Sequence, residues 1–275
     1  AGAVSVGVNG AVADNDVRNI ASIFGNGQLI ARNALSVLAN GSASANATLA
    51  GLDIGGVSVA ASVAVSVLRS EQRAEVDGPN VQAGSVTVVS NLNTNDRVTS
   101  SAELLTGGGA LFEAKANVAV AYGRSSSIAL FRPATLVSTG AMNVQSNGHA
   151  DTEAKITNQG FSYISATAMI ALSYAQGRFD AGMEIPENAD SETENSAGSI
   201  RVSTDYTANA DVELTPSAAG ISVNFASLAV NVAMANAGST SNAWIGGLGA
   251  LNAGTVDVHA IGEALAIVLG LMRSN

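Results

Sequence analysis

The chain has 275 residues, a net charge of −10, 12% charged and 4% aromatic residues, 29 glycines and no cysteine. The absence of cysteine excludes a disulfide scaffold, a thiolate zinc site and a cysteine nucleophile. The only lysines are Lys115 and Lys155. We therefore expect no nucleic-acid partner, because such a surface needs a basic stripe that releases counterions.

Membrane insertion has to be considered because the mean hydropathy is positive. The longest nearly uncharged apolar runs, 58–68 and 264–272, are shorter than the ~20 residues that cross a bilayer as a helix. An outer-membrane β-barrel is an open alternative, since alternating strands are its signature. Its aromatic girdles would need more than six Phe, four Tyr and one Trp. We therefore expect no membrane insertion.

A short motif, Gly-x-aliphatic-x-Val, recurs along the chain every 51 to 58 residues. It begins at Asn33, Gly84, Gly140, Gly198 and Gly254. Asn is the residue that best replaces Gly where φ is positive, so the motif predicts a left-handed turn immediately before a strand. A second motif of alternating large and small residues keeps the same spacing, at 63–67, 118–122, 170–174 and 228–232.

Two motifs with one spacing indicate a repeat protein. We expect a single array over 1–275, with repeats at approximately 1–53, 54–106, 107–159, 160–216 and 217–275. Each repeat begins with the alternating strand and a polar turn. A short apolar stretch, the Gly turn with its strand, a polar strand and a Gly-rich corner follow. Alternation of period two dominates and no segment keeps helical spacing, so the fold class is all-β.

Strand-only repeats that stack on their copies form a β-solenoid, in which neighbouring strands lie about 4.8 Å apart. We expect Val, Ile and Leu to alternate with Ala on the inward side of two closely packed sheets. The low charge follows from in-register stacking, which would place like charges beside one another. A period of about 55 residues allows either one wide, flattened coil with two long sheets, which we favour, or two shorter coils.

One polar series lies seven residues after the first motif: Asn40, Asn91, Asn147 and Asp205, interrupted by Ile261. Stacked amides hydrogen-bond along the axis of such arrays. The series predicts either a repeated binding site on one face or a turn ladder that satisfies buried backbone groups. We favour the turn ladder.

Catalytic residues are not predicted anywhere in the chain. The two histidines, His149 and His259, occupy different positions in their repeats, so we interpret them as solvated strand residues rather than a metal pair or part of a triad. Residues 107–109 are three glycines, but no helix follows them to make a phosphate site.

Carboxylates cluster once, between Phe179 and Gly198, where we expect a surface loop. Oxygen-rich loops bind Ca²⁺, so this cluster supplies the weak calcium candidates Asp180, Glu184, Glu187 and Asp190. It lacks the spacing of an EF-hand. We expect no other cofactor.

The alternating strands, the Ala-Gly-Ser-Val-Thr-Val segment at 83–88 and the polar Ser-Asn stretches resemble the repeat regions of large bacterial surface proteins, the filamentous-haemagglutinin-like and autotransporter-like adhesins. The resemblance covers all the repeats. It implies an extracellular β-solenoid at the bacterial cell surface, whose role is reach, rigidity and attachment.

Three functional hypotheses follow. The first is a non-enzymatic structural or adhesive segment that associates end to end through open strand edges, either with adjacent repeats of a longer chain or with another copy. Host or surface glycans are a further class of partner. The second is a β-helical polysaccharide lyase or depolymerase. The third, an ice- or surface-binding module, requires regularly spaced Thr, which the repeats lack.

Overall fold

The computed structural model describes residues 4–94, 99–138, 140–187, 195–216 and 226–270. Throughout this part every element is a strand. In chain order the strands are β1 (Val4–Phe24), β2 (Gln28–Gly41), β3 (Ala45–Asp77), β4 (Asn80–Leu92), β5 (Ser100–Arg132), β6 (Thr135–Ser138), β7 (Ala141–Ile185), β8 (Asn195–Pro216), β9 (Ala226–Gly247) and β10 (Leu251–Gly270). No helix that could cross a membrane occurs in these residues. The all-β prediction is confirmed.

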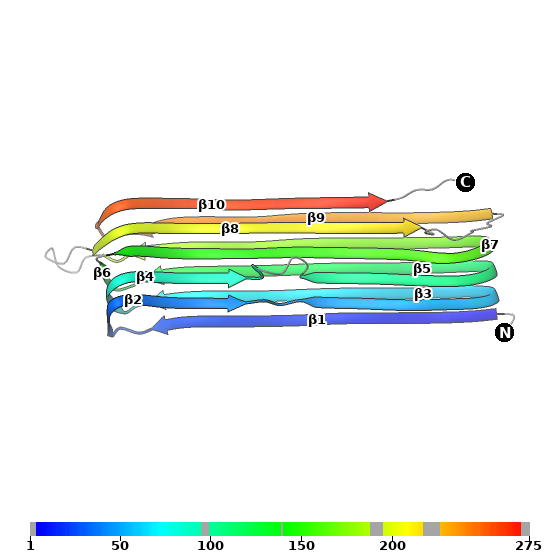
Figure 1. Cartoon of the computed structure of the whole chain (residues 1–275), viewed down its shortest axis with the longest axis horizontal. Helices are drawn as coiled ribbons and strands as arrows, with labels where there is room; N and C mark the ends of the chain where they lie inside the picture. Colours follow the sequence, from blue (N-terminus) through cyan, green and yellow to red (C-terminus); the bar gives the residue numbers. More distant parts are fainter. Residues whose placement is uncertain (1–3, 95–98, 139, 188–194, 217–225, 271–275) are drawn as a thin grey trace.

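The ten strands form one sheet, and all their pairings are parallel. One series of pairings joins β1, β3, β5, β7 and β9, and another joins β2, β4, β6, β7, β8 and β10. Each of the strands β3, β5 and β7 bends back on itself at the end of the molecule seen on the right in Figure 1, so that the two halves of β3 pair separately with the two halves of β5, and those of β5 with those of β7.

The sheet therefore has two layers. Layer 1 consists of β1, residues 57–77, 112–132 and 164–185, and β9. In layer 2, β2 is followed along the chain by 45–54, β4 by 100–110 and β6 by 141–162. Strands β8 and β10 complete the layer. Long parallel strands stacked in this way make a solenoid-like fold.

The glycines of the repeated motif do not form the expected left-handed turn. Gly84, Gly198 and Gly254 lie inside β4, β8 and β10, and Gly140 directly precedes β7. None of them has a positive φ, which among the described glycines occurs at Gly25, Gly78 and Gly247 near the layer-to-layer turns.

Close approach of the backbone explains the motif glycines instead. The register between β2 and β4 shifts between Ala31 and Ala34, so that two residues, Arg32 and Asn33, lie opposite the single residue Gly84. A Cβ atom on Gly84 would overlap the carbonyl oxygen of Asn33. A Cβ on Gly140 would likewise overlap the carbonyl of Gly84. The motif thus marks a stacked bulge, where each backbone occupies the space of its neighbour's side chain.

The alternation in the first half of layer 1 is the reverse of our expectation. Val57, Val59 and Val63 point outward and are 36–44% exposed, whereas Ser62 and Ala64 between and beside them are buried. The expectation that the large aliphatic residues point inward is wrong here.

The narrow space between the layers gives the reason. Ser66 in layer 1 donates its hydroxyl to the carbonyl of Ala45 in layer 2 at 2.6 Å, and its Oγ lies 2.8 Å from that of Ser100. Ser173 and Thr152 bridge the layers in the same way at 2.7 Å. Beside Ser66 and Ser173 the interlayer space is bridged by hydroxyl groups, and the valines of β3 lie on the outer side.

In part of layer 2, around Leu35, Val37 and Val144, apolar side chains point inward as expected. Leu52, Ile54 and Phe161, near the bends, are instead 61–72% exposed.

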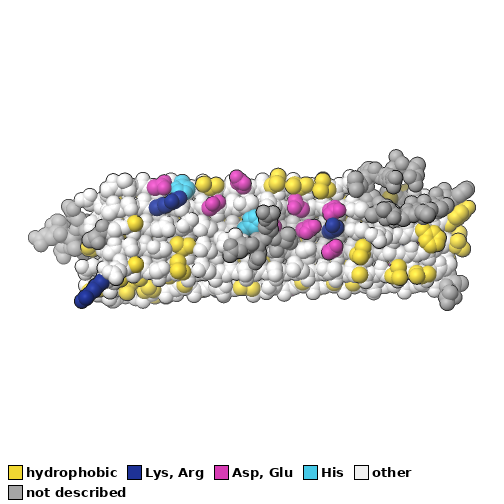
Figure 2. All heavy atoms as spheres, viewed as in Figure 1, with side chains coloured by type: hydrophobic (Ala, Val, Ile, Leu, Met, Phe, Trp, Pro, Cys, Tyr) yellow, Lys and Arg dark blue, Asp and Glu magenta, His cyan; other side chains and the backbone are white. Residues whose placement is uncertain are grey.

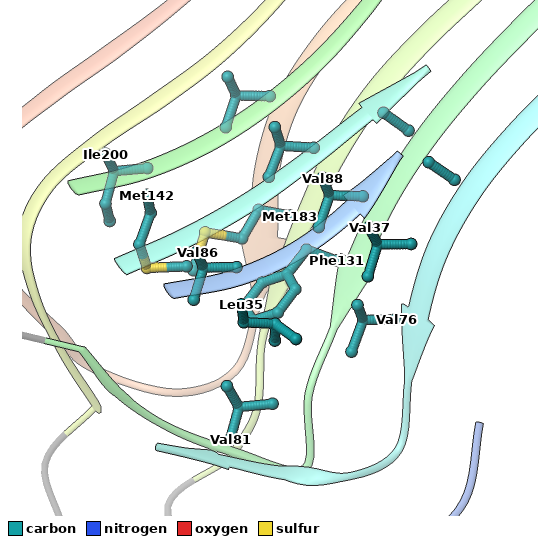
Figure 3. Packing of buried hydrophobic residues seen from close by; sticks show 14 of the residues in the cluster. Leu35, Val37, Val76, Val81, Val86, Val88, Phe131, Met142, Met183 and Ile200 are labelled. Atoms are coloured by element: carbon teal, nitrogen blue, oxygen red, sulfur yellow. The ribbon is translucent and has the colours of Figure 1, made fainter. Parts of the chain in front are cut away.

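Toward the end opposite the bends, the layers enclose larger residues (Figure 3). There Val76, Phe131 and Met183 of layer 1 pack against Leu35 and Met142 of layer 2. This cluster is the main hydrophobic core of the described residues.

An aromatic pair between β7 and β8 lies nearer the middle of the strands than this cluster does. The rings of Phe179 and Tyr206 stack with centroids 3.9 Å apart. Both side chains are fully or almost fully buried, and burial raises the pKa of the Tyr206 hydroxyl above its ordinary range. Gly148 and Gly177 leave room for the rings, because a Cβ at either position would overlap them.

Candidate functional site

The polar series of the sequence forms a ladder on the outer face of layer 2. Asn40, Asn91, Asn147, Asp205 and Ile261 are consecutive register partners in β2, β4, β7, β8 and β10. Asn91 donates its amide to Asn40, and Asn147 donates to Asn91, both at 2.8 Å. The residues lie within strands rather than in a turn, and their amides bond one another. The ladder therefore ties successive strands together.

The two histidines lie on strands and do not meet. His149 is 2.7 Å from a carboxylate oxygen of Asp151, on the same strand. His259 lies 3.3 Å from Asp257, with the Arg201 guanidinium 3.4 Å away. In β8, the register partner of His149 is Thr207 and that of His259 is Ser203. These partners are four residues apart, so the imidazoles are about 13 Å apart along the strand direction.

Acidic side chains gather around Lys155 on the outer face of layer 2. Figure 2 shows this face, with its acidic groups concentrated in the half nearer β8 and β10. Lys155 bonds Glu213 at 2.8 Å, and this bond holds the pKa of Glu213 below its ordinary value. Burial raises the pKa of Glu153, with further contributions from the charges of Glu103, Glu213 and Asp211. The cluster is a network of carboxylates around one ammonium group.

Two of the calcium candidates lie on an extended strand rather than in the expected loop. Asp180 and Glu184 lie in β7, which continues to Ile185, and Glu187 follows it. Asp190 lies outside the described residues. Asp180 accepts hydrogen bonds from Arg178 at 2.6 Å and from Asn242 at 2.9 Å. Within the described ranges, no group of three or more His, Asp or Glu side chains is arranged to hold a metal ion.

Charged residues also populate the second half of layer 1, where they pair between neighbouring strands. Arg69 is the register partner of Arg124 and bonds Asp14 at 3.2 Å. Glu75 is bonded by Arg73 and Arg132. Although burial raises the pKa of Glu75, these two guanidinium groups hold it below its ordinary value. The charged groups of Arg69, Arg73 and Arg132 are therefore engaged in ion pairs with carboxylates of the same layer.

The stack has open strand edges at both ends. The sequence predicted these edges but not the residues that they expose. In the described residues, β1 and β2 pair only with β3 and β4, and β9 and β10 only with β7 and β8. Val256 and Val258 on the inner side of β10 are 55% and 42% exposed. Their partners in β8, Ile200 and Val202, are 2% and 0% exposed.

The hydrophobic core is therefore uncovered at the β10 end. Apolar residues on both sides of the last strand, such as Val258 and Ile261, were the available signal in the sequence. No protein-family model, curated protein or solved structure matches the chain.

Proposed function

We propose that the chain is a non-enzymatic structural segment of an extracellular bacterial filament or large surface protein. In this proposal it is a β-solenoid of five wide, flattened coils of about 55 residues. The open strand edges associate end to end, either with adjacent repeats of a longer chain or with another copy. The uncovered core at Val256 and Val258 is the observation that carries the proposal.

Burial of that core supplies the driving force. Each of the two valines contributes about 1 kcal/mol when covered, because full burial of such a side chain stabilises by roughly 1.5–3 kcal/mol. The unpaired backbone groups of β9, β10, β1 and β2 add the directionality of a parallel ladder. An edge of this kind accepts a strand that continues the same alternation.

The register of the paired strands defines which residues of a following strand would lie beside the open edge. Successive partners in layer 1 are Asp14, Val67, Tyr122, Tyr174 and Asn236. Continuing the series places Asp14 of a following copy beside Asn236. In layer 2 the same continuation places Asn40 beside Ile261.

The pair Asn236 and Asp14 offers a direct test. Asn236 is exposed and its neighbour within the chain, Tyr174, is uncharged, so replacing it leaves the isolated chain unchanged. Asn236→Asp places like charges opposite each other, whereas Asn236→Lys places opposite charges there. By sedimentation velocity at low salt, we expect Asn236→Asp to raise the concentration required for assembly about threefold to tenfold, and Asn236→Lys to lower it.

The two variants control for each other, since both change one exposed side chain at one position. Added salt should make the concentrations that the two variants require for assembly more similar, because exposed charges are screened. Equal behaviour of the two at low salt, or a monomer at every concentration, would reject association in this register.

A further inference from the structure

The outer side of layer 1 carries a continuous apolar surface, which we call the valine face. It consists of the outward side chains at 4–12 of β1, 57–65 of β3, 112–120 of β5, 164–172 of β7 and 228–234 of β9. All of them are Val, Ala, Ile, Leu, Phe or Met, apart from the glycine at position 10.

The valine face is well exposed. Val6 and Val8 on β1 are 73% and 81% exposed, Phe112 on β5 is 51% exposed, and Leu228 and Val230 on β9 are 68% and 57% exposed. A monomeric soluble protein rarely exposes a contiguous apolar patch larger than several hundred Å². This surface therefore indicates a partner.

On the outer side of layer 1, charged side chains occur only beyond the valine face. The outward positions from Asp14, Arg69 and Arg124 onward carry the ion pairs described above, whereas the valine face has no ionised side chain. The nearest charges in β5, Glu113 and Lys115, point inward and pair at 2.5 Å with almost no exposure. Covering the face thus requires no charge to be desolvated.

The relief of the face is complementary to itself. A shallow groove with a volume of about 420 Å³ crosses the strands, and its lining includes Ala61, Ala116 and Ala168 together with Ala114 and Ala166 of the adjacent row. Two positions along each strand, Val63, Val118 and Ile170 form a parallel ridge. A twofold axis that lies in the plane between the two faces, perpendicular to the strands and between the rows of Ala116 and Val118, places the ridge of each copy over the groove of the other.

We propose that a second copy of this chain covers the valine face, in a face-to-face dimer about that axis. Ala116 then contacts Val118 of the second copy and the reverse contact is equivalent, as in an isologous interface. The exposed side chains offer on the order of 1,000 Å² of apolar surface, compared with about 800 Å² per partner in a standard stable interface. This contact is lateral and independent of end-to-end association.

The two kinds of contact can be distinguished by distance. Copies stacked end to end along five strands of layer 1 place equivalent residues about 24 Å apart, since neighbouring strands are about 4.8 Å apart. Face-to-face copies bring the two Ala116 positions much closer. The chain has no cysteine, so a single introduced thiol reports one position.

The experiment treats Ala116→Cys with a bismaleimide whose reach is shorter than the stacking distance. Ala50→Cys is the matched control, because Ala50 is an exposed alanine on the opposite outer face. We expect a cross-linked dimer from Ala116→Cys and none from Ala50→Cys. Light scattering should give twice the chain mass of 27.3 kDa, or an even multiple where stacking also occurs.

A charge introduced into the groove completes the test. Ala116→Glu should weaken the dimer at least tenfold while Ala50→Glu leaves it unchanged, with both variants folded by circular dichroism. Equal cross-linking at both positions, or no cross-linked dimer from Ala116→Cys, would overturn the proposal. So would binding of the valine face to phosphatidylcholine vesicles that Ala116→Glu abolishes while the chain itself stays monomeric.

Discussion

Val258 lies directly beside Val202 on the inner side of layer 2, yet 42% of Val258 is exposed whereas Val202 is fully buried. The two residues have the same chemistry and the same orientation. They differ because β10 covers Val202, whereas no further strand among the described residues covers Val258. The difference measures how incomplete the core is at the β10 edge. It is the physical basis for the proposal that another strand covers this end.

Extension of the amide ladder should stabilise the fold. Asp205 is the register partner of Asn147. The amide oxygen of Asn147 accepts a hydrogen bond from Gln145 at 2.9 Å. Asp205→Asn supplies an amide donor in line with the existing ladder. We expect a gain of about 0.5–1.5 kcal/mol in the free energy of unfolding, measured by urea denaturation. Asp205→Ala is the control, and a gain of equal size in that variant would contradict the ladder explanation.

The aromatic pair predicts which glycines are indispensable. Gly148→Ala introduces a carbon atom into the ring of Phe179 and should destabilise by about 1–3 kcal/mol through overpacking. Gly238→Ala is matched, because nothing lies within 4 Å of its Cβ position. Thermal unfolding followed by circular dichroism should separate the two variants clearly. Similar melting temperatures of the two variants would contradict close packing of the Phe179 ring against Gly148.

The buried pair of Glu113 and Lys115 predicts a non-additive result. Lys115→Met leaves the Glu113 carboxylate buried without its partner and should cost about 3–5 kcal/mol. Replacing both residues with Met removes the stranded charge and should restore most of the loss. Urea denaturation of the two single variants and the double variant gives the coupling free energy. A double variant as unstable as Lys115→Met would contradict this.

The acidic cluster predicts a pH-dependent gain. The pKa of Glu153 is raised in the folded state, so the folded chain holds that proton more tightly than the unfolded chain does. Its contribution to stability is full below the unfolded pKa and is lost as pH rises through the folded pKa. Glu153→Gln should therefore stabilise the protein at pH 7, with a gain that shrinks as pH falls toward 4. Melting temperatures across this range test it, and a gain independent of pH would contradict it.

Sequence periodicity was sufficient for the class of fold but not for the orientation of its strands. Alternation from Val57 to Val67 defines two faces, one of valine and alanine and one of serine and alanine. Period alone does not say which face is inside. The structure decides this through the separation of the layers, which Ser66 and Ser100 bridge with their hydroxyls. That separation depends on residues in two different strands, so it is invisible along one segment.

The motif glycines show a similar limit. Their spacing predicted a left-handed turn, but a turn and a bulge both favour glycine. At Gly84 the deciding fact is the carbonyl of Asn33, about fifty residues earlier in the chain. Close approach across strands can be read only once the register is known.

Imaging of the assembled protein tests the central claim most directly. Electron microscopy of the concentrated chain should show filaments with a subunit repeat of about 24 Å along the axis, because each copy adds five strands of layer 1 spaced about 4.8 Å apart. Isolated particles at all concentrations, or filaments in which the strands run along the axis, would contradict end-to-end association through the open edges.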